Sequence, residues 1–255
     1  MPEKAGIFYF EHRGGGLSGG SPPLVFIHGA GGDYLHWPPQ VRRLPGETVY
    51  ALDLPGHARS EGPGCSSIEG YVARIEDWME SMGLSRIILG GHSMGGAITQ
   101  QFALQSPQKL SGLLLVGTGG RLRVRPTILE ATTDPARFEE AVDMIIDWSF
   151  SDSAPERLIE LARRRMLEVD HNVIHDDFIA CDNFDVMDRV GEIELPALVI
   201  CGEADRLTPM KYSDFLVDRL SHAQLMRVPD AGHMVMLEKP EIVAQAVAEF
   251  AAEID

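Results

Sequence analysis

Short runs of apolar residues alternate with longer amphipathic stretches along most of this chain. Runs such as Leu24–Ile27 and Leu113–Val116 are apolar throughout, as in parallel strands that are covered on both faces. Polar and apolar positions recur with helical spacing over the segments Ile68–Met82, Met94–Gln105, Lys211–Leu220 and Pro240–Glu253. Strands that alternate with helices in this way form βαβ units. The pattern therefore predicts an α/β fold, with a mostly parallel central sheet and helices on both faces.

The alternation stops between Gly119 and about Val190. This interval has no convincing strand pattern, but amphipathic segments predict helices at Pro135–Phe150, Pro155–Val169 and Asn172–Asp182. The first two of these segments start with a proline, which is tolerated in the first turn of a helix. We therefore divide the chain into an α/β core, residues 1–120 and 190–255, and a helical insertion, residues 121–189.

Chain length, charge and apolar content indicate which partners and which cellular compartment to expect. A chain of 255 residues is long enough for one sizeable core, and its formal net charge of −16 argues against binding to nucleic acid or to an anionic membrane. The N-terminal residues do not form an apolar signal segment, and no apolar run approaches the ~20 residues that a membrane helix needs. We expect a cytoplasmic protein without a membrane or nucleic-acid partner. Because the cysteines and histidines do not follow metal-ligand spacing, we also expect no metal and no cofactor.

The segment Gly91–Gly95, with the sequence GHSMG, carries the most specific chemical signal. It lies between the apolar run Ile87–Leu89 and the predicted helix that starts at Met94. A serine between two glycines at a strand-to-helix turn is the sequence form of a nucleophile elbow. The turn is strained and crowded, which is why small residues flank it, and it lifts the Ser93 hydroxyl clear of the sheet. Ser93 is therefore a candidate nucleophile.

Other short motifs follow apolar runs in an order that matches a known superfamily. In chain order they are His28-Gly29-Ala30, the segment from Asp53 to Ser60, the elbow, the segment from Gly202 to Asp205, and Gly232-His233. With these motifs the chain resembles serine hydrolases of the α/β-hydrolase superfamily, of the carboxylesterase-like type, over nearly its whole length. The resemblance implies that the helical insertion is a cap over the active site. It also implies an antiparallel hairpin at the start of the sheet, but too few residues precede the strand Ile7–Phe10, so we expect a trimmed edge.

The resemblance further implies a catalytic triad of Ser93, Asp205 and His233. A serine hydroxyl needs a base to take its proton as it attacks, and the base needs a carboxylate to orient it. Glu203 is a second carboxylate close to Asp205. Some relatives take the acid from the turn after the strand that here ends at Val116, but that turn holds no carboxylate. Asp205 is therefore the expected acid.

The resemblance also implies that the backbone N–H groups of Ala30 and Met94 form the oxyanion hole. For the substrate pocket we expect Leu35 and Trp37, which follow the Ala30 loop, with Met94 and the insertion segment Ile145–Phe150 as further walls.

Three arginines alternate at the start of the insertion, at positions 121, 123 and 125, in an otherwise acidic chain. Arg121 is the candidate for binding a substrate carboxylate or phosphate, because a guanidinium matches the shape of both groups. The alternative, which we favour, is exposed pairing with the many nearby acidic side chains.

The predicted activity is hydrolysis of carboxylic esters of small or medium molecules through an acyl-enzyme on Ser93. Hydrolysis of a carbon–carbon bond in a vinylogous diketone stays open, although relatives with that activity usually have tryptophan and asparagine where this chain has Met234 and His92. Thioester or lactone hydrolysis and a ligand receptor on a hydrolase scaffold stay open as well. Dehalogenases and epoxide hydrolases are disfavoured, because they have an aspartate in place of Ser93.

Overall fold

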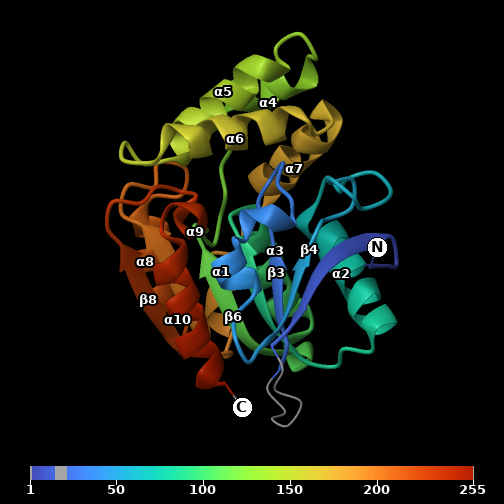
Figure 1. Cartoon of the computed structure of the whole chain (residues 1–255), viewed down its shortest axis with the longest axis vertical. Helices are drawn as coiled ribbons and strands as arrows, with labels where there is room; N and C mark the ends of the chain where they lie inside the picture. The colour runs from blue at the N-terminus through green and yellow to red at the C-terminus, as the bar shows by residue number, and fades with distance from the viewer. Residues whose placement is uncertain (1, 15–21, 255) are drawn as a thin grey trace.

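A computed structural model describes residues 2–14 and 22–254, and an eight-stranded sheet lies at its centre (Figure 1). The strands lie in the order β1-β2-β4-β3-β5-β6-β7-β8. Their bounds are β1 Glu3–Lys4, β2 Ile7–Arg13, β3 Leu24–Ile27, β4 Thr48–Leu52, β5 Ile87–His92, β6 Leu110–Val116, β7 Ala197–Gly202 and β8 Ala223–Val228. The pairs β1–β2 and β2–β4 are antiparallel, and every pair from β4 to β8 is parallel.

Successive residues of a strand face opposite layers of the molecule. In β3, Val25 and Ile27 pack into one apolar cluster, whereas Leu24 and Phe26 pack into the other. Since both faces are covered, every residue of such a strand is buried, and this produces the continuous apolar runs in the sequence.

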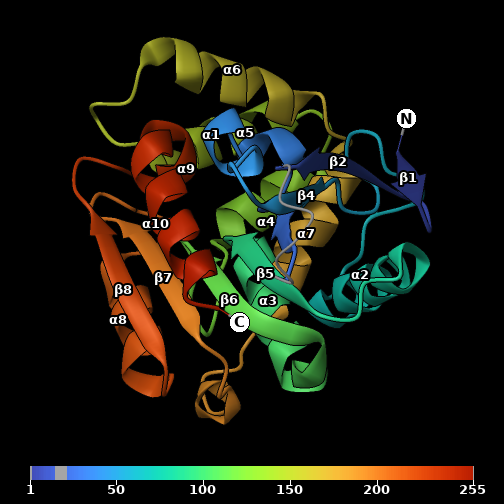
Figure 2. The ribbon, with the colours of Figure 1, turned by 60° about the horizontal axis from the view of Figure 1, so that its bottom comes forward.

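Helices cover both faces of the sheet (Figure 2). One face carries α2 Ile68–Met82, α3 Met94–Gln105 and α8 Met210–Arg219, and the other carries α1 Pro39–Arg42, α9 Val235–Glu238 and α10 Pro240–Ala252. Short 3-10 turns lie at Tyr34–His36, Pro107–Lys109 and Val190–Glu192. The predicted α/β fold with a mostly parallel sheet is confirmed.

Helix α2 shows how local sequence sets the bounds of an element. Ser67 caps its first turn, because the side chain accepts a hydrogen bond from the N–H of Gly70 at 3.1 Å. Gly83 ends the helix with φ of +69°, a left-handed conformation that favours glycine.

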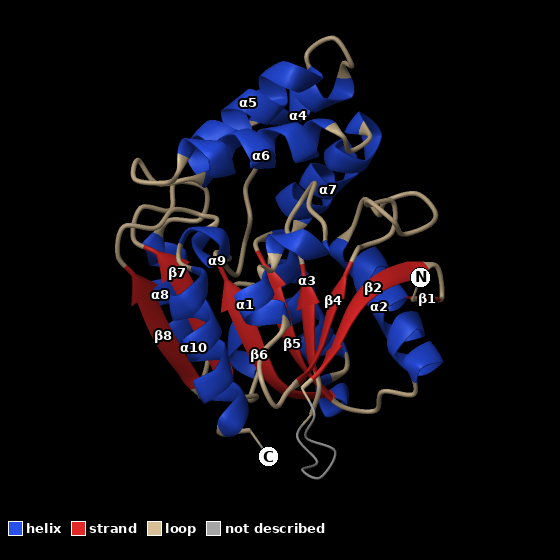
Figure 3. Cartoon of the chain, viewed as in Figure 1, coloured by secondary structure: helices blue, strands red, loops and turns tan. Residues whose placement is uncertain are grey.

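Four helices connect β6 to β7, and we call them the cap helices: α4 Pro126–Thr133, α5 Phe138–Ser149, α6 Glu156–Leu167 and α7 His171–Asn183. They lie together beyond the carboxyl ends of the parallel strands, where the arrowheads point in Figure 3. Three of them fall in the segments predicted to be helical, and α4 was not predicted. Its eight residues bury only Ile128, Ala131 and Thr132, too short an apolar pattern to stand out in the sequence.

The edge of the sheet is trimmed as expected, but the prediction that too few residues precede Ile7 for a first strand is wrong. A first strand does exist, although it has only two residues, and Glu3 and Lys4 pair with Phe8 and Ile7 of β2. Within residues 2–14 and 22–254, the helices are all too short or too polar to cross a membrane.

Candidate active site

Ser93 occupies the turn between β5 and α3 in a strained backbone conformation, with φ of +53° and ψ of −114°. The turn leaves no space for side chains at the flanking glycines. A Cβ atom on Gly91 would lie 2.0 Å from the carbonyl oxygen of Gly95, and one on Gly95 would lie 2.5 Å from that of Ile27. The two glycines are therefore a steric requirement of this strand-to-helix turn.

Asp205 and His233 meet from the loops after β7 and β8. His233 Nδ1 lies 2.9 Å from Asp205 Oδ2, and both side chains are buried. Thr208 joins the pair, because its hydroxyl donates to Asp205 Oδ2 at 2.8 Å and lies 3.2 Å from His233 Nδ1. The carboxylate therefore holds one ring nitrogen of His233.

Asp205 is held in its charged form by its surroundings. Its other oxygen, Oδ1, accepts backbone N–H groups of Leu207 and Thr208 at 2.9 and 2.8 Å. Burial alone would raise the pKa of Asp205, but His233 and these hydrogen bonds outweigh burial and lower the pKa below its ordinary value. Glu203, the alternative acid, is exposed.

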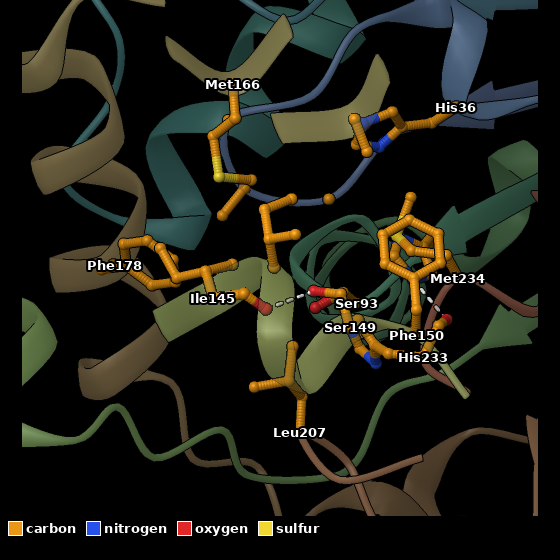
Figure 4. A pocket seen from close by; sticks show the side chains of 16 residues that line it. His36, Ser93, Ile145, Ser149, Phe150, Met166, Phe178, Leu207, His233 and Met234 are labelled. Carbon is orange, nitrogen blue, oxygen red and sulfur yellow. Dashed lines mark hydrogen bonds between the residues drawn. The ribbon is translucent and has the colours of Figure 1, made fainter. Parts of the chain in front are cut away.

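Ser93 and His233 open into the same cavity, on which the cap helices form a largely apolar wall (Figure 4). His36, the last residue of the 3-10 turn Tyr34–His36, also faces it. The wall residues from α5 to α7 and the turn after α5 are Ile145, Ile146, Ser149, Phe150, Ala162, Met166 and Phe178. The segment Ile145–Phe150 thus contributes to the wall as expected. We call this space the apolar cavity.

His92, the residue before Ser93, supports the loop that carries His233. Its Nε2 lies 3.0 Å from the backbone carbonyl oxygen of His233, and the two ring centroids are 4.5 Å apart. Burial lowers the pKa of His92 well below its ordinary value, so the ring is neutral and donates its proton from Nε2 to that carbonyl. The sequence pattern did not indicate this role, because it places His92 only at a variable position of the elbow.

Ala30 and Met94, the residues expected to form the oxyanion hole, lie on the two segments that meet at Ser93. Ala30 lines the cavity beside Ser93, and Met94 is the first residue of α3. The first N–H groups of a helix have no partner within the helix. A Cβ atom on Gly29 would lie 3.1 Å from Ser93 Cβ, so the Ala30 loop packs closely on the elbow.

Asp177 of α7 holds the Ala30 loop from the cap side. Its Oδ2 accepts the N–H of Gly31 at 2.8 Å and lies 2.8 Å from His57 Nε2, and its Oδ1 accepts the hydroxyl of Tyr71. Asp177 and His57 have no exposed surface. We find no signal for this contact in the sequence, because Asp177 and Gly31 lie 146 positions apart.

His57 is charged in this arrangement. Its Nδ1 faces the carbonyl oxygen of Pro55 at 3.0 Å and its Nε2 faces Asp177, so both nitrogens meet acceptors and both must donate. Burial lowers the pKa of His57, but the charge and hydrogen bond of Asp177 outweigh burial and raise it above its ordinary value.

The substrate-binding roles expected for Leu35, Trp37 and Arg121 need correction, since none of the three lines the apolar cavity. Trp37 has no exposed surface and packs on Phe26, with ring centroids 4.5 Å apart, because its large apolar ring is driven into the core under the sheet. Leu35 lines a separate hollow between the α1 region and α6. Arg121 is exposed and lies 3.7 Å from Asp185, where the chain enters and leaves the cap. Met94, the other expected wall residue, is fully buried in the core.

A second cavity adjoins Ser93 and Ala30, and we call it the arginine cavity. Phe178 and Leu207 are common to both cavities. The remaining lining residues of the arginine cavity are Leu122, Arg123, Val124, Arg125, Ile128, Trp148, Cys181, Arg206, Thr208 and Tyr212.

A strained serine at a strand-to-helix turn, beside a buried histidine–carboxylate pair, is the arrangement of a hydrolase with a nucleophilic serine. The chain belongs to the alpha/beta hydrolase family, whose model matches residues 24–246.

Individual relatives are distant but cover most of the chain. A solved thermophilic esterase is 33% identical, with a TM-score of 0.81, over 97% of this chain and 98% of its own. An enol-lactonase from Burkholderia xenovorans LB400 has a TM-score of 0.88 at 22% identity, over 96% of each chain, which shows the shared fold alone. The dihydrolipoyllysine-residue acetyltransferase component of an acetoin-cleaving system from Pseudomonas putida is 26% identical over 91% of this chain but only 64% of that protein.

Proposed function

We propose that this protein hydrolyses carboxylic esters of small or medium molecules, with Ser93 as nucleophile, His233 as base and Asp205 as the orienting acid. The observation that carries the proposal is the 2.9 Å contact of His233 with Asp205 beside a cavity that His233 shares with Ser93. Because Asp205 engages Nδ1, the Nε2 nitrogen of His233 is the one available to Ser93.

In the first half of the reaction, Ser93 Oγ attacks the ester carbonyl carbon and His233 Nε2 takes the hydroxyl proton. The carbonyl oxygen becomes an oxyanion, and the backbone N–H groups of Ala30 and Met94 stabilise it. The bond to the alcohol oxygen then breaks, His233 gives its proton to the leaving alcohol, and an acyl-enzyme remains on Ser93. Asp205 stabilises the imidazolium between these two proton transfers.

In the second half, water takes the place of the alcohol. His233 accepts a proton from the water as its oxygen attacks the acyl carbon, and the second oxyanion occupies the same site. The bond to Ser93 Oγ breaks, His233 returns the proton to the serine, and the carboxylic acid leaves. Each backbone donor is typically worth ~3–4 kcal/mol of transition-state stabilisation.

Esters are favoured over thioesters and lactones because, among the similar proteins described above, the solved esterase has the highest sequence identity to this chain, at 33%. The lining of the apolar cavity also fits the uncharged chain of an ester. Hydrolysis of a carbon–carbon bond is disfavoured by Met234 and His92, and His92 here serves to hold the backbone of His233.

Hydrolysis of p-nitrophenyl esters from acetate to long chains, by the wild type and by Ser93→Ala, tests the proposal. We expect turnover with an optimum chain length, and its loss in the folded variant. Labelling of the wild type by a fluorophosphonate probe is the second measurement. A folded wild type that neither turns over these esters nor takes the label would contradict the proposal and favour a receptor.

A further inference from the structure

The two cavities that meet at Ser93 differ in charge. The apolar cavity is lined without arginine, lysine, aspartate or glutamate. The arginine cavity has a volume of about 150 Å³ and is lined by three arginines and no carboxylate, in a chain that has 38 acidic and 22 basic residues. The wall of this cavity therefore carries three positive charges and no negative one, whereas the chain as a whole is negatively charged.

Of the three arginines, Arg125 is the one whose N–H donors are most available to a ligand. Its guanidinium carbon lies 3.8 Å from the centroid of the Trp148 ring, which is also part of the cavity wall. Stacking on an aromatic face orients the planar group and leaves the N–H donors at its edge available. Among residues 2–14 and 22–254, no carboxylate lies within 4.0 Å of its nitrogens.

The other two arginines are paired, but with groups outside the cavity lining. Arg123 donates to the backbone carbonyl of Asp182 at 2.8 Å and lies 3.8 Å from Asp185, and Arg206 pairs with Asp152. All of these charged side chains are at least two-fifths exposed, except Asp182, whose contact is through its backbone. Such exposed pairs contribute little and can be rearranged by a ligand.

We propose that the arginine cavity is a subsite for a carboxylate on the substrate, with Arg125 as its principal ligand and Arg123 and Arg206 as the supporting charges. This inference rests on the proposed ester hydrolysis, and it names the substrate class. The substrate is an ester with an uncharged part in the apolar cavity and a carboxylate on the other side of the scissile bond. A half-ester of a dicarboxylic acid or an ester of a hydroxy acid has this form. Arg121, the earlier candidate, is excluded from the subsite by its position at the cap entrance.

Two matched pairs of esters test the inference, with acid release followed by pH-stat titration. For a carboxylate on the acyl side, the pair is ethyl hydrogen adipate and the corresponding half-amide, ethyl adipamate. For a carboxylate on the alcohol side, the pair is 3-acetoxybenzoate and 3-acetoxybenzamide. In one pair we expect kcat/KM of the wild type to favour the anionic member, and Arg125→Gln to reduce that preference about tenfold, the loss expected for one charge-assisted hydrogen bond. The change should lie mainly in KM, because Arg125 would bind a group that does not react, and would bind it equally in the ground state and the transition state.

Arg121→Gln is the matched control, since it removes the same charge from the same segment at a residue outside the cavity lining. It should leave both kcat/KM ratios unchanged, and it should hydrolyse the neutral members as the wild type does. A wild-type ratio near one in both pairs, or a ratio that Arg125→Gln does not lower, would overturn the inference. Either result would leave the proposed function in place, provided that Ser93 is required for hydrolysis of the neutral esters.

Binding gives a readout that does not depend on turnover. Calorimetric titration of the Ser93→Ala protein should show tighter binding of adipate than of adipamide. The double variant with Ser93→Ala and Arg125→Gln should bind adipate about tenfold more weakly than the single variant. If no ester is hydrolysed, the proposed function fails, and this titration alone decides whether the arginine cavity binds a carboxylate. Equal affinity for adipate and adipamide would then refute such binding.

Discussion

His57 and Asp177 form a fully buried ion pair between the core and the cap, with Nε2 of His57 2.8 Å from Oδ2 of Asp177. The same carboxylate oxygen accepts the N–H of Gly31, the residue after Ala30. The pair therefore fastens helix α7 to the loop that we assign to the oxyanion hole, and its charge state should influence how firmly the cap is held.

The Asp177→Asn change should destabilise the fold in a pH-dependent way. The pKa of His57 is raised above its ordinary value of 6.5, so the contribution of the pair is complete below pH 6.5 and is lost as the pH rises through the raised pKa. We expect the variant to lose roughly 3 kcal/mol of unfolding free energy at pH 6, as for the loss of one partner of a buried pair, and less at pH 9. Urea denaturation at the two pH values measures the difference.

Asp176→Asn provides the control for that experiment, because it removes the same charge from the neighbouring residue of α7. Asp176 is partly exposed. Its replacement should change the unfolding free energy by only about 0.5 kcal/mol at either pH. A destabilisation by Asp177→Asn that grows as the pH rises would show that His57 is neutral in the folded protein.

Asp205→Asn should lower kcat for p-nitrophenyl butyrate by roughly 10⁴-fold, the effect of the equivalent change in another serine hydrolase. The amide cannot stabilise the imidazolium of His233 or fix its tautomer. Glu203→Gln should leave kcat unchanged, because Glu203 is exposed and the contact to His233 is made by Asp205. If Glu203→Gln is the damaging change instead, the assignment of the acid is wrong.

Gly91→Ala should destabilise the protein by about 3 kcal/mol, at the upper end of the range for overpacking, because the added Cβ would lie 2.0 Å from a backbone oxygen that cannot move aside. Gly191→Ala is the comparison, since the nearest atom to its added Cβ is 3.7 Å away. Thermal melts followed by circular dichroism measure both. Equal melting temperatures for the two variants would show that the elbow can relax, against the steric reason given for its glycines.

Ala162→Leu should shorten the preferred chain length of the substrate. Ala162 lies on α6 and lines the apolar cavity, so a leucine there occupies part of the cavity that Ser93 also lines, without disturbing the helix. Two ester series, one varied in the acyl chain and one in the alcohol, should show a shift in the series whose chain occupies this cavity. An unchanged optimum in both would mean that the chain does not enter the apolar cavity.

The sequence by itself determined the elements and the chemical motifs of this protein. The observed bounds of α2 and α3 coincide with the predicted ones, because their signals are local: a serine cap and a left-handed glycine for α2, and the elbow for α3. Strands buried on both faces produce apolar runs that are readable without any knowledge of their neighbours. The short helix α4 and the two-residue strand β1 were not predicted, since neither is long enough to show a periodic pattern of apolar residues.

Only the tertiary structure decided which side chains surround the candidate nucleophile. Trp37 follows the Ala30 loop in sequence yet packs in the core, while Arg125 lines a cavity that Arg121, four residues earlier, does not reach. Asp177 meets Gly31 across 146 positions. These outcomes depend on how the helices and loops of the core and the cap pack on the sheet, and that packing is a sum of contacts between distant segments. No local pattern of residues records it, which is why the sequence predicts the triad but not the shape or the charge of its pocket.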